Sequence, residues 1–91
     1  MVERRVVVRL REGVHARPAA QLAQLASEFA ATVQLCRDSL VVDARSALGI
    51  LSLAAEYGAE LLIRAKGPDA HEAVECIAAF LQGEKQVRRE R

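Results

Sequence analysis

His15 and Arg17 stand two residues apart in segment 13–19, which reads GVHARPA. A neutral imidazole is a nucleophile that can form a covalent intermediate, and a guanidinium group donates bidentate hydrogen bonds to phosphate oxygens. Pro18 is tolerated in the first turn of a helix, so a helix is expected to begin between Ala16 and Pro18. Backbone N–H groups at a helix start lack helical partners and bind anions. The segment therefore predicts either a phosphoryl-accepting histidine or, as the plainer alternative, a histidine that only caps the helix.

The other candidate residues show no comparable chemistry. His71 lies among Asp69 and Glu72, so we expect an exposed helix residue in an acidic setting. Neither histidine has cysteine or carboxylate partners at the spacing of a metal site. Cys36 and Cys76 fit no zinc pattern and no disulfide framework, so we expect reduced packing residues. The sequence predicts no metal and no cofactor.

The spacing of apolar residues predicts seven elements. Valine-rich or alternating runs indicate strands, and a 3.6-residue repeat indicates helices. The expected strands cover residues 2–10, 32–36, 40–44 and 60–66, and the expected helices cover 18–29, with a start close to 16–18, then 46–54 and 69–83. Asp69, followed three residues later by Glu72, predicts a capping box at the last helix.

The order β-α-β-β-α-β-α favours an α+β fold. Strands with one apolar side need helices on one face, so we expect a mostly antiparallel four-stranded sheet with three helices on one face. The same order suits ferredoxin-like and RNA-binding modules, and topology alone does not distinguish them.

The expected helix that begins at Ser46 is apolar on two faces. One stripe consists of Ile50, Leu53 and Ala54, and the other consists of Leu48 and Leu51. Such a short helix is either fully buried or buried on one side and used for docking on the other.

Length and composition restrict the class of protein. The chain has 91 residues, which suits one domain, and we place that domain at residues 1–83. A net charge of +1 and an aromatic content of 3% argue against nucleic acid as the main partner. The apolar run at 6–8 is too short for a signal peptide or a membrane span, so we expect a cytoplasmic protein without membrane insertion. Residues 84–91 are expected to form a charged, disordered tail.

Three segments resemble the HPr family, the histidine-containing phosphocarriers of the bacterial phosphoenolpyruvate:sugar phosphotransferase system. Segment 13–20 (GVHARPAA) resembles the active-site motif of that family, and segment 45–53 (RSALGILSL) resembles its regulatory-serine segment from Gram-positive-type bacteria. Segment 58–73 is similar to the family's last strand and the turn into its final helix. The resemblance extends over residues 2–81 and implies the open-faced sandwich of HPr, a four-stranded antiparallel sheet packed under three helices.

The resemblance also implies roles for the residues around His15. His15 would accept the phosphoryl group through Nδ1, and Arg17 would stabilise that group and the transition state for its transfer. The backbone amides of Ala16 and Arg17 would donate to it. Enzyme I would supply the group from phosphoenolpyruvate and enzyme IIA domains would accept it, so we expect a monomeric phosphocarrier rather than an enzyme.

The second motif implies regulation and docking. Ser46 would be phosphorylated by HPr kinase/phosphorylase, and the phosphorylated chain would engage a catabolite-control transcription regulator. Leu48, Leu51 and Ala47 would contact partners, although the family often has a larger apolar residue at position 47. Glu12 is a second departure, because the family often has Asn or Ser there and a carboxylate would repel a phosphohistidine.

Alternative functions remain open. One is an HPr-like regulatory binding protein that acts through Ser46-phosphate-dependent docking; some relatives have lost the active histidine and kept only this role, whereas this chain keeps His15. Another is a nitrogen-related paralogue that phosphorylates regulators, against which the Arg45-Ser46 context argues. An RNA-binding module is the weakest alternative, because the strands lack aromatic residues.

Overall fold

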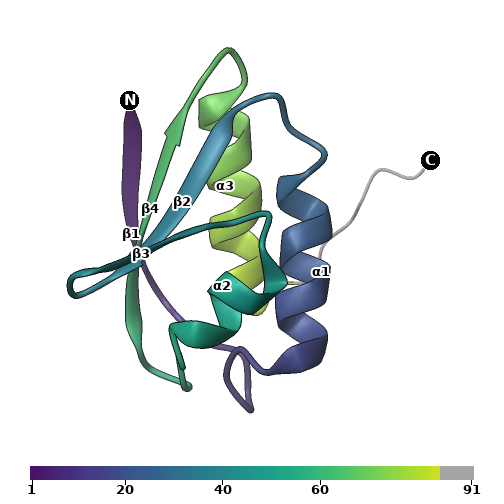
Figure 1. Cartoon of the computed structure of the whole chain (residues 1–91). Helices are drawn as coiled ribbons and strands as arrows, with labels where there is room; N and C mark the ends of the chain where they lie inside the picture. The colour runs from purple at the N-terminus through teal and green to yellow at the C-terminus, as the bar shows by residue number, and fades with distance from the viewer. Residues whose placement is uncertain (85–91) are drawn as a thin grey trace.

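One layer of the protein is an antiparallel sheet with the spatial order β1-β4-β2-β3. The computed structural model describes residues 1–84, so the expected tail lies, apart from Glu84, outside the described residues. The strands are β1 (Val2–Val7), β2 (Thr32–Arg37), β3 (Leu40–Asp43) and β4 (Glu60–Lys66). Figure 1 shows the three helices together on one side of this sheet: α1 (Ala16–Ala26), α2 (Ala47–Ser52) and α3 (Ala70–Leu81). The predicted element order and architecture are confirmed.

The sheet buries one face because its side chains alternate. In β4, Leu61, Ile63 and Ala65 are buried, while the residues between them are half-buried. Cross-strand pairing extends this apolar face, since Val6 lies opposite Leu61 and Leu35 lies opposite Ile63. Burying aliphatic side chains between sheet and helices is the main force that holds such a layer pair together.

Each helix contributes an apolar side to the same core. The α3 helix packs on β1, β2 and β4, α1 packs against α2 and α3, and α2 packs against β3. The large side chains of this core that are under 2% exposed are Val8, Leu22, Val33, Leu35, Ile50, Leu61, Ile63, Val74, Ile77 and Leu81.

The predicted capping box at α3 is wrong. Asp69 occupies the N-cap position, but its side chain makes no capping hydrogen bond. Its carboxylate instead accepts the backbone N–H groups of Ala30 at 2.9 Å and Ala31 at 2.8 Å. Donation from Ala30 is the largest of the effects that hold the pKa of the Asp69 carboxyl below its ordinary value. The side chain therefore fastens the end of the α1–β2 connection to the start of α3.

Several elements are shorter than the sequence predicts. The first strand ends at Val7, because the Val8 and Arg9 N–H groups donate to the carbonyls of Ala59 and Leu81 outside the strand ladder. The first helix ends at Ala26 rather than at residue 29, and the second ends at Ser52 rather than at residue 54. The strand at 60–66 lies where it was predicted.

Candidate functional site

His15 stands at the N-cap of α1 with an exposed side chain. Its backbone is extended, and its carbonyl accepts the first helical hydrogen bond from the Ala19 N–H at 2.9 Å. The imidazole itself makes no capping hydrogen bond, so His15 occupies the N-cap position through its backbone alone. The imidazole is instead available to an incoming group.

The first turn of α1 offers donors beside that imidazole. The amides of Ala16 and Arg17 precede the first helical hydrogen bond, and Pro18 has no N–H. No acidic residue lies in this turn. Within residues 1–84, the exposed Arg17 side chain makes no ion pair or hydrogen bond. The two residues that follow His15 thus carry two backbone amides without helical partners and one exposed guanidinium, which are donors of the kind that bind a phosphoryl group.

The backbone that precedes His15 is fixed by contacts with the loop that follows α2. The Val14 N–H donates to the Ala55 carbonyl at 2.8 Å, and the Val14 side chain is buried. Gly13 has a φ of +76°, and a Cβ there would stand 2.8 Å from the Ala55 oxygen. A residue with a side chain would be strained at this position and would also collide with the loop after α2. The sequence analysis did not predict this contact between Gly13 and Ala55. Its only sign in the sequence is the glycine two residues before the histidine.

The two faces of α2 differ sharply in exposure. Ile50 and Leu53 are 1% and 3% exposed, whereas Leu48 is 79% and Leu51 is 36% exposed. The alternative of a fully buried helix is therefore wrong. Ala54 does not belong to the buried stripe, because the chain leaves the helix after Ser52 and turns there with a φ of +50°.

Ser46 is an exposed N-cap residue at the start of α2. Its Oγ accepts the Gly49 N–H at 2.9 Å, as a serine cap does. Arg45 precedes it and lies with its Nε 3.7 Å from Asp43 Oδ1. Ala47 follows and is half-buried. The exposed face of α2 therefore has a hydroxyl group at its start and leucine side chains along its length.

The structure separates the two histidines. His71 is exposed in the first turn of α3, and the start of α3 is fastened to the connection that follows α1. His15 stands at the opposite end of α1, whose eleven residues span about 16 Å. His71 is thus remote from the donors around His15. Glu12 is exposed in the turn before Gly13.

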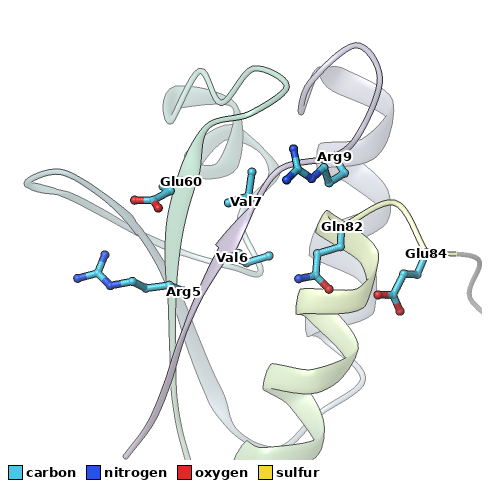
Figure 2. A pocket seen from close by; sticks show the side chains of 7 residues that line it. All are labelled: Arg5, Val6, Val7, Arg9, Glu60, Gln82 and Glu84. Atoms are coloured by element: carbon cyan, nitrogen blue, oxygen red, sulfur yellow. The ribbon is translucent and has the colours of Figure 1, made fainter.

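His15, Ala16 and Arg17 are all exposed at the protein surface. Figure 2 shows a hollow elsewhere, between β1 and the end of α3, and its lining includes none of the predicted site residues. Its charged side chains are of both signs, with Arg5 and Arg9 against Glu60 and Glu84, and they do not converge on one point.

Residues 1–84 contain neither an evident metal site nor a candidate membrane span. No group of three or more histidine, cysteine or carboxylate side chains could hold a metal ion in that part of the chain. Likewise, none of the helices described there has the length and apolar character that crossing a membrane requires.

Comparison with known proteins links this geometry to a family. Residues 2–83 match the family model described as the PTS HPr component phosphorylation site. The chain is 44% identical over 84 residues to the HPr-like protein Crh of Bacillus subtilis, which covers 92% of this chain and 99% of that protein. It is 43% identical over 82 residues to the phosphocarrier protein HPr of Treponema pallidum, with 90% and 93% covered.

Solved structures agree with these relatives. A crystal structure of the phosphocarrier protein HPr from Bacillus anthracis superposes with a TM-score of 0.85 at 42% identity and covers 88% of this chain and 95% of that one. A crystal structure of Bacillus subtilis Crh superposes with a TM-score of 0.76 at 43% identity, with 94% and 99% covered, and is described as a swapped, intertwined dimer. The fold and the carrier class implied by the sequence motifs are confirmed.

Proposed function

This chain belongs to the HPr family of phosphocarrier proteins, and on that basis we propose that His15 accepts a phosphoryl group from enzyme I and passes it to sugar-specific enzyme IIA domains. The observation that carries this proposal is an exposed imidazole at the start of α1 that is not used as a cap. An imidazole engaged in capping could not act as a nucleophile without disrupting the helix start.

The proposed transfer needs positioning and charge stabilisation rather than a larger catalytic apparatus. Nδ1 of His15 forms the N–P bond while the bond between phosphorus and the donor breaks. In such a transfer, negative charge is spread over the three phosphoryl oxygens. The amides of Ala16 and Arg17 and the Arg17 guanidinium donate to those oxygens. Because the site is exposed, the donor and the acceptor can reach the same nitrogen in turn.

The test is phosphorylation by purified enzyme I and phosphoenolpyruvate, followed by mapping of acid-labile phosphate. We expect labelling of wild type and of His71→Ala, and none of His15→Ala. His71→Ala is the matched control, because both histidines are exposed in or next to a first helical turn. Labelling that persists in His15→Ala would refute the assignment.

A second role is supported by the geometry of Ser46. This side chain is exposed at a helix start, where a phosphate adds about −1.5 to −2 charge and the helix dipole tolerates it. We propose that HPr kinase/phosphorylase modifies Ser46 and that the product docks to a catabolite-control regulator. The similarity to Crh, a protein named as HPr-like, favours considering this role beside the carrier role. Acid-stable phosphate on wild type, but not on Ser46→Ala, is the expected result with kinase and ATP.

Docking of partners is proposed to use the exposed face of α2. Leu48 and Leu51 provide its apolar surface, and Ala47 lies beside them. We propose that the carrier acts as a monomer, with β1 paired to β4 of the same chain. Sedimentation at concentrations used for phosphorylation tests this state, and a stable dimer like that of the Crh crystal would overturn it.

A further inference from the structure

Arg37, the last residue of β2, holds the chain segment that follows α2. Its Nη1 donates to the carbonyl of Leu53 at 3.0 Å and to that of Ala54 at 2.8 Å. Its Nη2 lies 3.2 Å from Oε1 of Glu56. One half-buried guanidinium group from the sheet thus binds three points of the loop at residues 53–56.

The backbone of this loop has carbonyls without helical donors and an unfavourable φ angle, and both need stabilising contacts. The last carbonyls of a helix lack helical donors, and Arg37 donates to the carbonyl of Leu53 at the C-cap of α2 and to that of Ala54 directly after it. Ala54 adopts a φ of +50°, a conformation that residues with a Cβ rarely favour. The backbone N–H of Glu56 and, after it, the Arg37 guanidinium hold the pKa of the Glu56 carboxyl below its ordinary value. The ion pair is therefore present at neutral pH.

The same loop supports the backbone next to His15. Ala55, inside the segment that Arg37 binds, accepts the Val14 N–H at 2.8 Å. Gly13 packs so closely that a Cβ would stand 2.8 Å from the Ala55 oxygen. Val14 directly precedes His15. The Val14 side chain is buried, whereas the His15 side chain is exposed. A continuous set of contacts therefore runs from Arg37 through the loop to the histidine.

We propose that Arg37 is a positioning residue for phosphoryl transfer, acting through the loop at 53–56 and Val14 on the placement of the His15 imidazole. The inference rests on the proposed role of His15. Arg37 itself needs no contact with the phosphoryl group. Because a displacement of about 1 Å at a reacting atom can cost up to about a hundredfold in rate, loss of this support should be visible in the transfer step.

The chain provides a matched control in Arg64. This arginine lies on the neighbouring strand β4, is half-buried, and pairs through Nε with Oε2 of Glu3 at 3.2 Å. Arg37→Ala and Arg64→Ala each remove one arginine and one exposed ion pair, but only the first removes contacts to the loop.

Single-turnover phosphorylation by phosphorylated enzyme I measures the effect. We expect Arg37→Ala to lower the limiting rate about tenfold while the apparent KM for enzyme I changes by less than about twofold. Arg64→Ala should leave both values within about twofold of wild type. Arg37→Lys, which keeps a donor for the two carbonyls, should recover most of the rate.

Hydrogen exchange at the Val14 amide gives a measurement independent of any partner. We expect this amide to exchange about tenfold faster in Arg37→Ala than in Arg64→Ala, while the β2–β4 ladder keeps its protection in both. Normal labelling of wild type together with an unchanged rate in Arg37→Ala would overturn the positioning role alone. Absence of labelling in wild type would overturn the proposed function. Faster exchange throughout the sheet with a raised KM would indicate general destabilisation and would also overturn the positioning role.

Discussion

Leu48 and Ile50 allow the docking face of α2 to be tested with two substitutions in one short helix. Both are large aliphatic residues two positions apart, yet Leu48 is 79% exposed and Ile50 is 1% exposed. Truncating a buried isoleucine to alanine costs about 2–5 kcal/mol of unfolding free energy, because contacts are lost and a cavity remains. Truncating an exposed leucine changes that free energy by about 0.5 kcal/mol or less.

The expected loss in docking follows from the same exposure. Full burial of a leucine side chain contributes about 1.5–3 kcal/mol. Because Leu48 is 79% exposed in the free chain, about four fifths of this, or about 1.2–2.4 kcal/mol, is available to a partner that covers it completely. At tenfold per 1.4 kcal/mol, Leu48→Ala should raise the apparent KM for enzyme I by about 7- to 50-fold at most.

Two measurements on the same preparations separate docking from stability. Urea unfolding gives the free energy of unfolding, and initial rates of phosphorylation by a fixed amount of enzyme I against carrier concentration give the KM. We expect Leu48→Ala to change the KM alone and Ile50→Ala to lower stability by the larger amount. An unchanged KM in Leu48→Ala, or a loss of stability equal to that of Ile50→Ala, would refute docking through this face.

Four further substitutions test the site and its support. Arg17→Ala should slow phosphoryl transfer while shifting the unfolding free energy by no more than about 0.5 kcal/mol, since the side chain is exposed and unpaired within the described residues; an unaltered rate would contradict its role. Gly13→Ala should lower stability by at least about 1–2 kcal/mol in urea unfolding, because the position has a φ of +76°. Ser46→Asp should slow the phosphorylation of His15 by enzyme I at low salt and slow it less at high salt. A reduction of the rate that does not depend on salt concentration would reject an electrostatic cause. The pKa of the Asp69 carboxyl lies below its ordinary value, chiefly through the Ala30 N–H, so its stabilising contribution is complete above about pH 4 and is lost as the pH falls further. The thermal midpoint of wild type should therefore fall more steeply with acid than that of Asp69→Asn, and parallel curves would disprove this.

The placement of His15 and Arg17 could be predicted from the sequence because it depends on local structure. His15 and Arg17 belong to one helix start, and the position of Pro18 already indicates where that helix begins. Helical spacing places Leu48 and Ile50 on different faces of α2, but only the structure shows that one face is exposed and the other is buried.

The support beneath the site could not be predicted in the same way, because its partners are distant along the chain. Arg37 binds carbonyls 16 and 17 positions later, and no periodicity marks such a pair. Asp69 shows the opposite failure: its spacing to Glu72 is that of a capping box, but the carboxylate binds amides 38 and 39 positions earlier. A competing long-range partner decides between these arrangements, and only the folded chain shows which one is present.

The proposed carrier role explains why an exposed histidine stands on a tightly packed backbone. A group that must reach a donor and then an acceptor cannot be fixed by surrounding it with protein, because the surroundings would exclude both partners. The histidine is instead fixed through its backbone, by the buried Val14 side chain, the close approach of Gly13 to the loop and the hydrogen bond from Val14 to Ala55. Substitutions beneath His15 should therefore impair transfer from every donor and to every acceptor alike. Substitutions on the exposed face of α2, such as those of Leu48, should affect each partner according to how much of that side chain it covers.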